Sequence, residues 1–322
     1  FKQKTAYEIS TRDWSSDVCS SDLHMSGRAL RVMASRGTPP GEDWTEGTRR
    51  AFVSLLGSGD WLVPTVAALE RYGLFSRFIP EWRAVRSLPQ RNAFHTYTVD
   101  RHLLQAVANA NEYVRDVARP DLLLVGALMH DLGKGYPGDH TDAGVELVDT
   151  VVVRMGFADD DVAVVRALVQ HHLLLPETAT RRDLTDPRTA RNVADAVGSV
   201  STLELLHALT RADSRATGPG AWSSWKQSLL QQLVDATSVV IRDGSVPASE
   251  LPLSADLTRL AALTAGDGAI HVEHVAGDGV DLLRIASRDR AGLFSHIAGV
   301  LAMHGLDVVG ASAATEIGRA HV

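Results

Sequence analysis

Apolar side chains recur every three or four residues through most of the region from Thr45 to Arg242, which is the spacing of helices with one buried face. Glycines, prolines and short polar runs interrupt the pattern and mark the expected helix ends. The sequence predicts helical segments at 45–82, 98–116, 121–132, 141–155, 160–172, 186–198, 201–216 and 223–242. This part of the chain is therefore expected to fold as an all-α region.

Three positions in this region carry more specific signals. The run Leu122–Met129 is apolar on every side, which predicts a helix buried all round. Ser201 and Glu204 have the spacing of a capping box and predict that a helix begins there. Pro176 is expected to end the helix that covers 160–172.

The pattern changes after Gly244. Residues 243–268 contain two prolines and scattered polar residues and are interpreted as a linker. Beyond it the sequence predicts strands at 271–274, 281–287 and 307–312, with an amphipathic helix at 291–304. An α+β fragment of this size, 269–315, is too small to bury a complete core by itself. The predicted fold class is mainly α, an all-α helical domain followed by a truncated α+β fragment.

The two ends of the chain show neither helical nor strand spacing. Residues 1–23 include the string DWSSDVCSSDL and residues 316–322 read EIGRAHV. Both resemble translated sequencing-adapter read-through, and the first lacks the apolar core of a secretory signal. We expect both ends to be artefacts, with a disordered terminus as the alternative, and we interpret 24–94 as a helical N-terminal extension.

Composition narrows the class of protein. The 322 residues, 45% hydrophobic and 22% charged, are enough for two folded domains. The chain has no run of about 18 apolar residues, so we expect no membrane span. A net charge of −7 argues against nucleic acid as the main partner. Cys19 is the single cysteine, which excludes a disulfide framework, so we expect a cytoplasmic protein that holds any metal through nitrogen and oxygen ligands.

Candidate metal ligands lie close to the predicted helix ends. His130 and Asp131 close the buried apolar helix, where an imidazole and a carboxylate are costly unless something pairs them. A lone helical histidine is usually a satisfied core or surface residue, but here several residues need one explanation. The others are His102, His140, His172 and Asp213. These ligand types suit Mg²⁺, Mn²⁺, Fe or Zn²⁺, so the sequence predicts a divalent metal site.

The order of His102, the pair His130-Asp131 and Asp213 resembles the HD superfamily of metal-dependent phosphohydrolases. Longer strings are more specific: HTYTVDRH at 95–102, GDH at 138–140, QHHLL at 170–174, RRD at 181–183 and WSSWKQSLL at 222–230. They resemble the HD domain of the bifunctional uridylyltransferase/uridylyl-removing enzymes, which modify the nitrogen-signalling protein PII. The resemblance covers about 61–242 and implies an HD domain at 95–242. The string RDRAGLF at 288–294 resembles the start of an ACT domain and implies a partial ACT-like domain at 269–315.

The resemblance also implies which residues bind the metal. The implied ligands are His102, His130, Asp131, His140, His172 and Asp213. Of the two adjacent histidines, His172 matches the family position and His171 replaces what is often a glutamine. Neighbouring residues on a helix point about 100° apart, so only His172 is expected to reach the ion. The set could hold one ion or a close pair, with Mn²⁺ or Mg²⁺ expected first and Fe or Zn²⁺ as alternatives.

Further residues are candidates for substrate and effector binding. Asp131 is expected to bind metal and orient the attacking water, and Lys134 to place a positive charge on the phosphodiester. A solvated lysine at a helix end is the alternative for Lys134. Arg181 and Arg182 could grip phosphate or an acidic partner, or could be a plain exposed pair. In the ACT-like fragment the resemblance places an effector site, for glutamine, at Asp289 and Gly292, with a simple turn before the helix as the alternative.

The implied reaction is hydrolysis of the phosphodiester that joins UMP, or AMP, to a tyrosine of PII. Residues 24–94 lack the Gly-Ser motif and paired aspartates of a nucleotidyltransferase, so we expect removal of nucleotidyl groups without transfer, from a truncated gene product. One alternative is an HD hydrolase of a free nucleotide such as ppGpp. The other is a catalytically inactive HD/ACT regulatory binding module, which predicts that no metal binds.

Overall fold

The computed structural model describes residues 27–41, 43–90, 95–184, 186–218, 222–244, 255–277, 280–288, 290, 292–308 and 311. Both ends interpreted as artefacts, and Asp289, lie outside the described residues. The chain forms two compact units with the main boundary between Val246 and Pro247. The structure is mainly helical with a small β fragment, as predicted.

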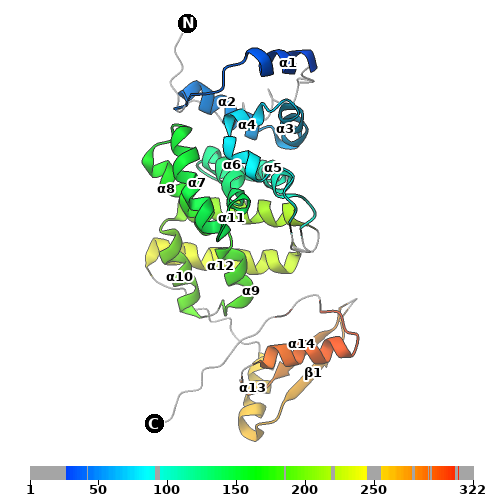
Figure 1. Ribbon diagram of the computed structural model, residues 1–322. Helices are drawn as coiled ribbons and strands as arrows, with labels where there is room; N and C mark the ends of the chain where they lie inside the picture. The colour runs from blue at the N-terminus through cyan, green and yellow to red at the C-terminus, as the bar shows by residue number, and fades with distance from the viewer. Residues whose placement is uncertain are drawn as a thin grey trace. The chain divides into compact units, whose positions relative to one another are not determined.

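The first unit is built from helices α1 to α12 (Figure 1). Their bounds are α1 Gly27–Arg36, α2 Glu46–Leu56, α3 Leu62–Glu70, α4 Phe75–Phe78, α5 Val99–Ala110, α6 Pro120–Met129, α7 His140–Arg154, α8 Asp159–Gln170, α9 Leu174–Arg181, α10 Pro187–Val197, α11 Val200–Thr217 and α12 Ser224–Asp243. Short 3₁₀ helices connect them at Gly59–Trp61 (η1), Pro80–Ala84 (η2), Asn111–Tyr113 (η3) and Leu132–Gly135 (η4).

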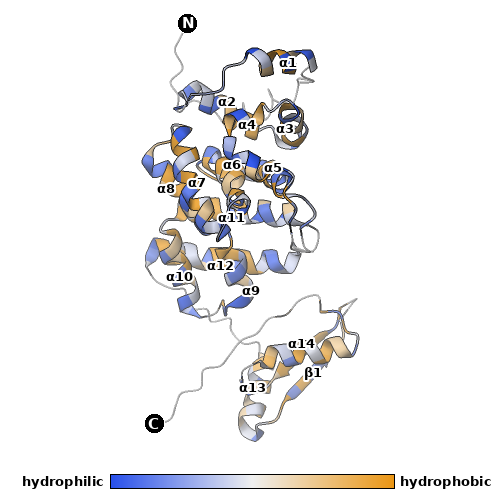
Figure 2. Cartoon of the chain, viewed as in Figure 1, coloured by the Kyte–Doolittle hydropathy of each residue, from blue (hydrophilic) through white to orange (hydrophobic). Residues whose placement is uncertain are grey.

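Helix α6 is the centre of the core. Every residue from Leu122 to Met129 is buried, which confirms the predicted all-round burial, and the helix is strongly hydrophobic in Figure 2. Helices α5, α8 and α11 pack against it, and α5 and α11 also pack along each other. A helix surrounded in this way has its C-terminal end fixed in position by packing on all sides. That end is where His130 and Asp131 lie.

A close approach of backbones joins η4 to α7. A Cβ atom on Gly133 would lie 2.0 Å from the carbonyl oxygen of His140, and one on Gly144 would lie 2.9 Å from Val169. Only glycine leaves room for this packing. The contact fixes the first turn of α7, which carries His140, against the segment that follows Asp131.

Three boundary predictions are wrong in detail. Pro176 does not end a helix: α8 ends at Gln170, and Pro176 lies in the first turn of α9, where a backbone N–H has no partner within the helix anyway. Helix α11 is capped by Ser199, whose side chain accepts a hydrogen bond from the Thr202 N–H, and not by Ser201. The helix predicted at 98–116 ends at Ala110.

The second unit contains α13 (Ala255–Asp267), β1 (His271–Val275), β2 (Leu282–Ala286) and α14 (Leu293–Met303). The strands pair antiparallel, with His271 opposite Ala286, and this confirms the first two predicted strands. The interval interpreted as a linker contains α13, whose Leu260 and Thr264 are buried. The third predicted strand includes residues outside the described part of the chain.

Among the described residues, no single helix has both the length and the apolar character to cross a membrane. One bent pair, Glu46–Leu56 with Gly59–Glu70, meets the length and composition test together at an angle of 97°.

Candidate metal centre

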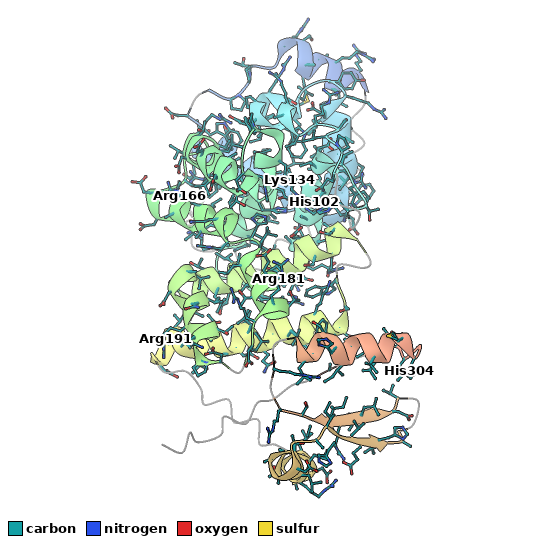
Figure 3. The ribbon with its side chains drawn as sticks, turned by 60° about the horizontal axis from the view of Figure 1, so that its bottom comes forward. His102, Lys134, Arg166, Arg181, Arg191 and His304 are labelled. Atoms are coloured by element: carbon teal, nitrogen blue, oxygen red, sulfur yellow. The ribbon has the colours of Figure 1, made fainter. Side chains whose placement is uncertain are left out.

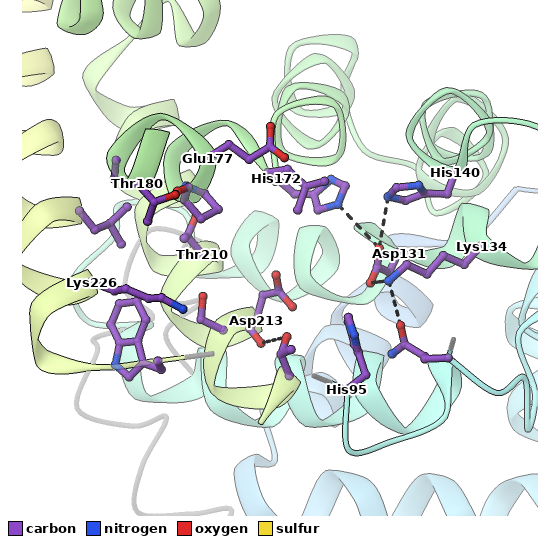
Figure 4. A pocket seen from close by; sticks show the side chains of 18 of the residues that line it. His95, Asp131, Lys134, His140, His172, Glu177, Thr180, Thr210, Asp213 and Lys226 are labelled. Carbon is purple, nitrogen blue, oxygen red and sulfur yellow. Dashed lines mark hydrogen bonds and ion pairs between the residues drawn. The ribbon is translucent and has the colours of Figure 1, made fainter. Parts of the chain in front are cut away.

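Five segments far apart in the sequence bring the candidate ligands together. His102 lies on α5, His130 ends α6 and Asp131 follows it, His140 is the first residue of α7, His172 lies between α8 and α9, and Asp213 is on α11. Figure 4 shows Asp131, His140, His172, His95 and Asp213 around one space. All six residues proposed from the sequence therefore converge, whereas the adjacent His171 takes no part in the groups able to hold a metal among the described residues.

The Oδ2 side of Asp131 faces a first group of ligand atoms. The Nε2 atom of His102 lies 3.4 Å from Asp131 Oδ2 and 3.0 Å from Asp213 Oδ1. The Nε2 atom of His130 lies 3.5 Å from each of the same two oxygens. Two ligand atoms that share an ion at about 2.1 Å each are separated by roughly 3.0–3.5 Å. These four side chains therefore have the spacing of one coordination sphere.

The other carboxylate oxygen of Asp131 faces a second group. Its Oδ1 atom lies 3.7 Å from His172 Nε2 and 3.8 Å from His140 Nε2, which is too far for a hydrogen bond. Among the described residues this buried oxygen has no hydrogen-bond partner. A buried carboxylate oxygen without a partner is costly, and a cation between it and the two imidazoles would satisfy it. The geometry of Asp131 thus fits one ion or two neighbouring ions.

Backbone carbonyls orient two of the imidazoles. His130 donates from Nδ1 to the Ala127 carbonyl at 2.9 Å, and His172 donates from Nδ1 to the Val169 carbonyl at 2.7 Å. Because the carbonyl can only accept, the proton is on Nδ1, and in the neutral ring Nε2 keeps its lone pair. Both Nε2 atoms point at Asp131. This is the arrangement that outer hydrogen bonds impose on metal-binding histidines.

Burial and charge oppose each other inside the cluster. Burial disfavours a charge on His130, but Asp131 and Asp213 outweigh it and raise the pKa of His130 to about 10. Burial likewise works against both carboxylates, yet the His130 charge holds the pKa of Asp131 and of Asp213 below its usual range. Burial lowers the pKa of His172, with the charge of His130 acting in the same direction. The cluster is therefore electrostatically suited to bind positive charge, either protons or a divalent cation.

Lys134 lies one turn beyond His130, with its ammonium 2.5 Å from Asp131 Oδ2 and 3.0 Å from Gln90 Oε1. Figure 3 shows Lys134 and His102 close together in the first unit. The lysine thus lies at the cluster as predicted, but its partner in this structure is Asp131. The side chain is partly exposed and borders the cavity in front of the cluster.

A cavity of about 930 Å³ opens onto the cluster. Arg181 lies on its wall beside Glu177, whereas Arg182 follows α9 as an exposed residue and does not line the cavity. Gly292 precedes α14 in the second unit with a left-handed φ of 78°, and Asp289 lies outside the described residues. The two arginines therefore differ in position, a distinction that the sequence did not provide.

Sequence reasoning missed several residues around this cavity. His95 has its ring centroid 5.3 Å from that of His102, and its buried Nδ1 has no hydrogen-bond partner among the described residues. His95 is seven residues before His102 in the string HTYTVDRH that carries the resemblance. This shared string was the sequence signal that could have placed His95 at the site. The cavity is also lined by Trp222, Trp225 and Lys226. From the sequence these three residues were identified only as part of a family motif.

Comparisons with known proteins identify the domain that carries this cluster. The family model of the HD domain matches residues 99–216. The chain is 44% identical over 324 residues to the bifunctional uridylyltransferase/uridylyl-removing enzyme of Streptomyces coelicolor, covering 89% of this chain and 39% of that protein. It is 45% identical over 272 residues to the enzyme of that name from Mycobacterium tuberculosis, covering 84% of this chain and 33% of the relative. The chain thus spans about two fifths or less of these relatives.

Proposed function

The chain carries an HD domain of the metal-dependent hydrolase type and is homologous over most of its length to uridylyl-removing enzymes, and on that premise we propose that it hydrolyses the phosphodiester between UMP, or AMP, and a tyrosine of PII. The observation that carries the proposal is the position of Asp131. One of its oxygens faces His102 and His130 and the other faces His140 and His172, at the base of an open cavity.

The residues around the cavity supply what this hydrolysis requires. A divalent ion held by the cluster lowers the pKa of water and so supplies hydroxide near neutral pH. Asp131 would bind the ion and orient the attacking water. Lys134 borders the cavity beside Asp131, where its ammonium can offset negative charge on the phosphoryl oxygens. We propose Mn²⁺ or Mg²⁺ as the ion, with Fe or Zn²⁺ as the alternatives, because the two carboxylates suit the first pair and the four imidazoles suit the second.

The leaving group explains why the site can operate without a strong general acid. A tyrosine phenol has a pKa of about 10, far below that of an aliphatic alcohol, so the phenolate departs readily once the phosphoryl group is attacked. Arg181, on the cavity wall, is placed to meet the phosphate or an acidic surface of the protein substrate. Glutamine binding near Gly292 stays a prediction from the resemblance alone.

The test is to incubate the chain with Mn²⁺ and nucleotidylated PII and to weigh the protein product by mass spectrometry. The expected result is loss of one nucleotidyl mass, abolished in His130→Ala and retained in His304→Ala, because His304 is an exposed histidine of the second unit. An unchanged PII mass would contradict the proposal. Release of pyrophosphate from ppGpp would favour the free-nucleotide hydrolase, and equal behaviour of His130→Ala and the unaltered chain would favour an inactive module.

A further inference from the structure

The cavity in front of the metal cluster has a second wall that the hydrolysis described above does not use. This wall is the start of α12, where Trp222, Trp225 and Lys226 all line the cavity. The described chain contains only two lysines, Lys134 and Lys226, and both border this one space. Two indoles and an ammonium group therefore lie in the same cavity as the metal ligands.

We propose that this wall, Trp222 to Lys226, is the subsite for the nucleoside of the nucleotidyl group that the enzyme removes, with the base stacked on Trp225. The proposal rests on the function proposed above and specifies its substrate as a nucleoside 5′-monophosphate ester. Lys226 meets the phosphate or a carbonyl group of the base. The phosphodiester then lies between this wall and Asp131.

The two tryptophans differ in a way that assigns their roles. Trp222 is partly buried and packs against the main core, so it holds the wall in place. Trp225 is 38% exposed, although it lines a cavity and is a large aromatic side chain. Every base has a π face, so uracil and adenine both gain stacking energy when they lie against an aromatic ring. Trp225 is therefore the ring available to a ligand.

Local structure fixes the geometry of this wall. Ser223 caps α12 and accepts a hydrogen bond from the Lys226 N–H, which sets the first helical turn that carries Trp225 and Lys226. In Figure 4 the side chain of Lys226 extends its ammonium towards the side of the cavity where Asp213 lies. The lysine thus points along the cavity between the indoles and the metal cluster.

Polar groups on α11 complete the subsite. Thr210, Ser214 and Thr217 line the cavity at spacings of four and three residues, so they share one face of the helix. The hydroxyls of Thr210 and Thr217 donate to the carbonyls of Leu206 and Asp213, so they can accept from a ribose or from the edge of a base, and Ser214 adds a third hydroxyl. Together, ring, ammonium and hydroxyls match a nucleotide better than a protein loop, whose apolar contacts would favour the lining residues Leu173 and Pro176.

The experiment measures binding of UMP, AMP and inorganic phosphate to the Mn²⁺-loaded full chain by titration calorimetry. Trp225→Ala is expected to weaken UMP and AMP binding on the order of 5- to 100-fold, and Trp225→Phe to restore most of it. Phosphate has no base, so its affinity is expected to change by less than about twofold. Lys226→Ala is expected to weaken UMP binding as well, with a smaller effect at high salt.

Trp61→Ala is the matched control, because Trp61 is a 54% exposed tryptophan outside the residues that line the cavity. It is expected to leave UMP affinity unchanged. If Trp225→Ala still binds phosphate, the variant is folded. If Trp225→Ala does not fold, UMP binding by Trp225→Phe provides the test.

Two results would overturn the subsite. One is UMP affinity that is equal in the unaltered chain and in Trp225→Ala and Lys226→Ala, or undetectable in all of them. The other is that Trp225→Ala and Lys226→Ala increase the KM for nucleotidylated PII and leave UMP affinity unchanged, which would assign the wall to the protein substrate. Tight UMP binding lost in Trp225→Ala, without hydrolysis of nucleotidylated PII, would support the subsite while contradicting the proposed reaction.

Discussion

The Nε2 atoms of His102 and His130 lie 3.3 Å apart, and both imidazoles are buried. Asp213 Oδ1 lies within 3.5 Å of both. Two ring nitrogens so close, with His130 already donating from Nδ1, need a proton or a cation between them and the carboxylates. A metal ion would therefore bind to the cluster in competition with protons, and this competition determines how the cluster should respond to metal and to substitution.

We expect Mn²⁺ to stabilise the folded chain, because the ligand set forms only when five distant segments come together. At a free ion concentration 100 times the dissociation constant, the free energy of unfolding should rise by about 2.7 kcal/mol. Urea denaturation with Mn²⁺ and with EDTA measures the difference. His130→Ala should remove it, and an equal gain in that variant would mean that the ion binds elsewhere.

His172→Ala should lose metal, whereas His171→Ala should keep it. His172 Nε2 faces Asp131, and its Nδ1 is held by a backbone carbonyl, while the neighbouring ring is only half-buried and outside the cluster. Removing an outer-shell partner of a metal ligand typically costs 10- to 100-fold in affinity, so loss of a ligand should cost at least about 100-fold. The measurement is the metal content of each variant after dialysis. Equal metal loss in both variants would refute the assignment of His172, and not His171, as the ligand.

Gly133→Ala should destabilise the fold and weaken metal binding together. The added Cβ would lie 2.0 Å from the His140 carbonyl oxygen, so α7 must shift, at a cost of about 1–3 kcal/mol. Gly266→Ala is the matched control, since nothing lies within 4 Å of its Cβ and the site is in helix α13. That variant should be neutral or gain up to about 1 kcal/mol. Denaturation and metal titration of both variants measure the two effects, and unchanged metal affinity in Gly133→Ala would separate His140 from the site.

His207 should make the fold sensitive to mild acid. Burial, helped by the charge of Arg211, lowers the pKa of His207 to about 4. The unfolded chain, with a histidine pKa near 6.5, binds more protons between pH 6.5 and 4, so stability should fall as the pH drops through this window. The loss is up to about 3 kcal/mol. In urea titrations with EDTA, His207→Gln should reduce the dependence of the unfolding free energy on pH. Parallel pH curves for His207→Gln and the unaltered chain would refute this role of His207.

The sequence predicted the parts of the fold and site that depend on local pattern. Eight consecutive apolar residues before His130 left no polar face, so burial of α6 followed directly. The rotation between neighbouring helical positions indicated that only one of His171 and His172 reaches the ion, and the family resemblance selected His172, which in the structure faces Asp131.

Tertiary packing determined what the sequence could not predict. The sequence predicts that a helix ends at Pro176, but this proline lies in the first turn of α9, where proline costs little. Helix α13 was missed because the prolines before it dominated the interpretation of the whole interval. The cavity wall with Trp225 depends on how α12 lies beside α11 and α9, which no local spacing reveals.

The complete burial of Leu122–Met129 in α6 also limits the chain lengths that this protein can tolerate. One residue inserted between Pro120 and His130 would rotate the histidine by about 100° relative to the start of the helix. Since every side chain from Leu122 to Met129 is enclosed, the helix has no solvent-facing side that could absorb such a rotation. Insertions and deletions here should therefore abolish activity even when they preserve composition, and the number of residues in α6 is itself a constraint on catalysis.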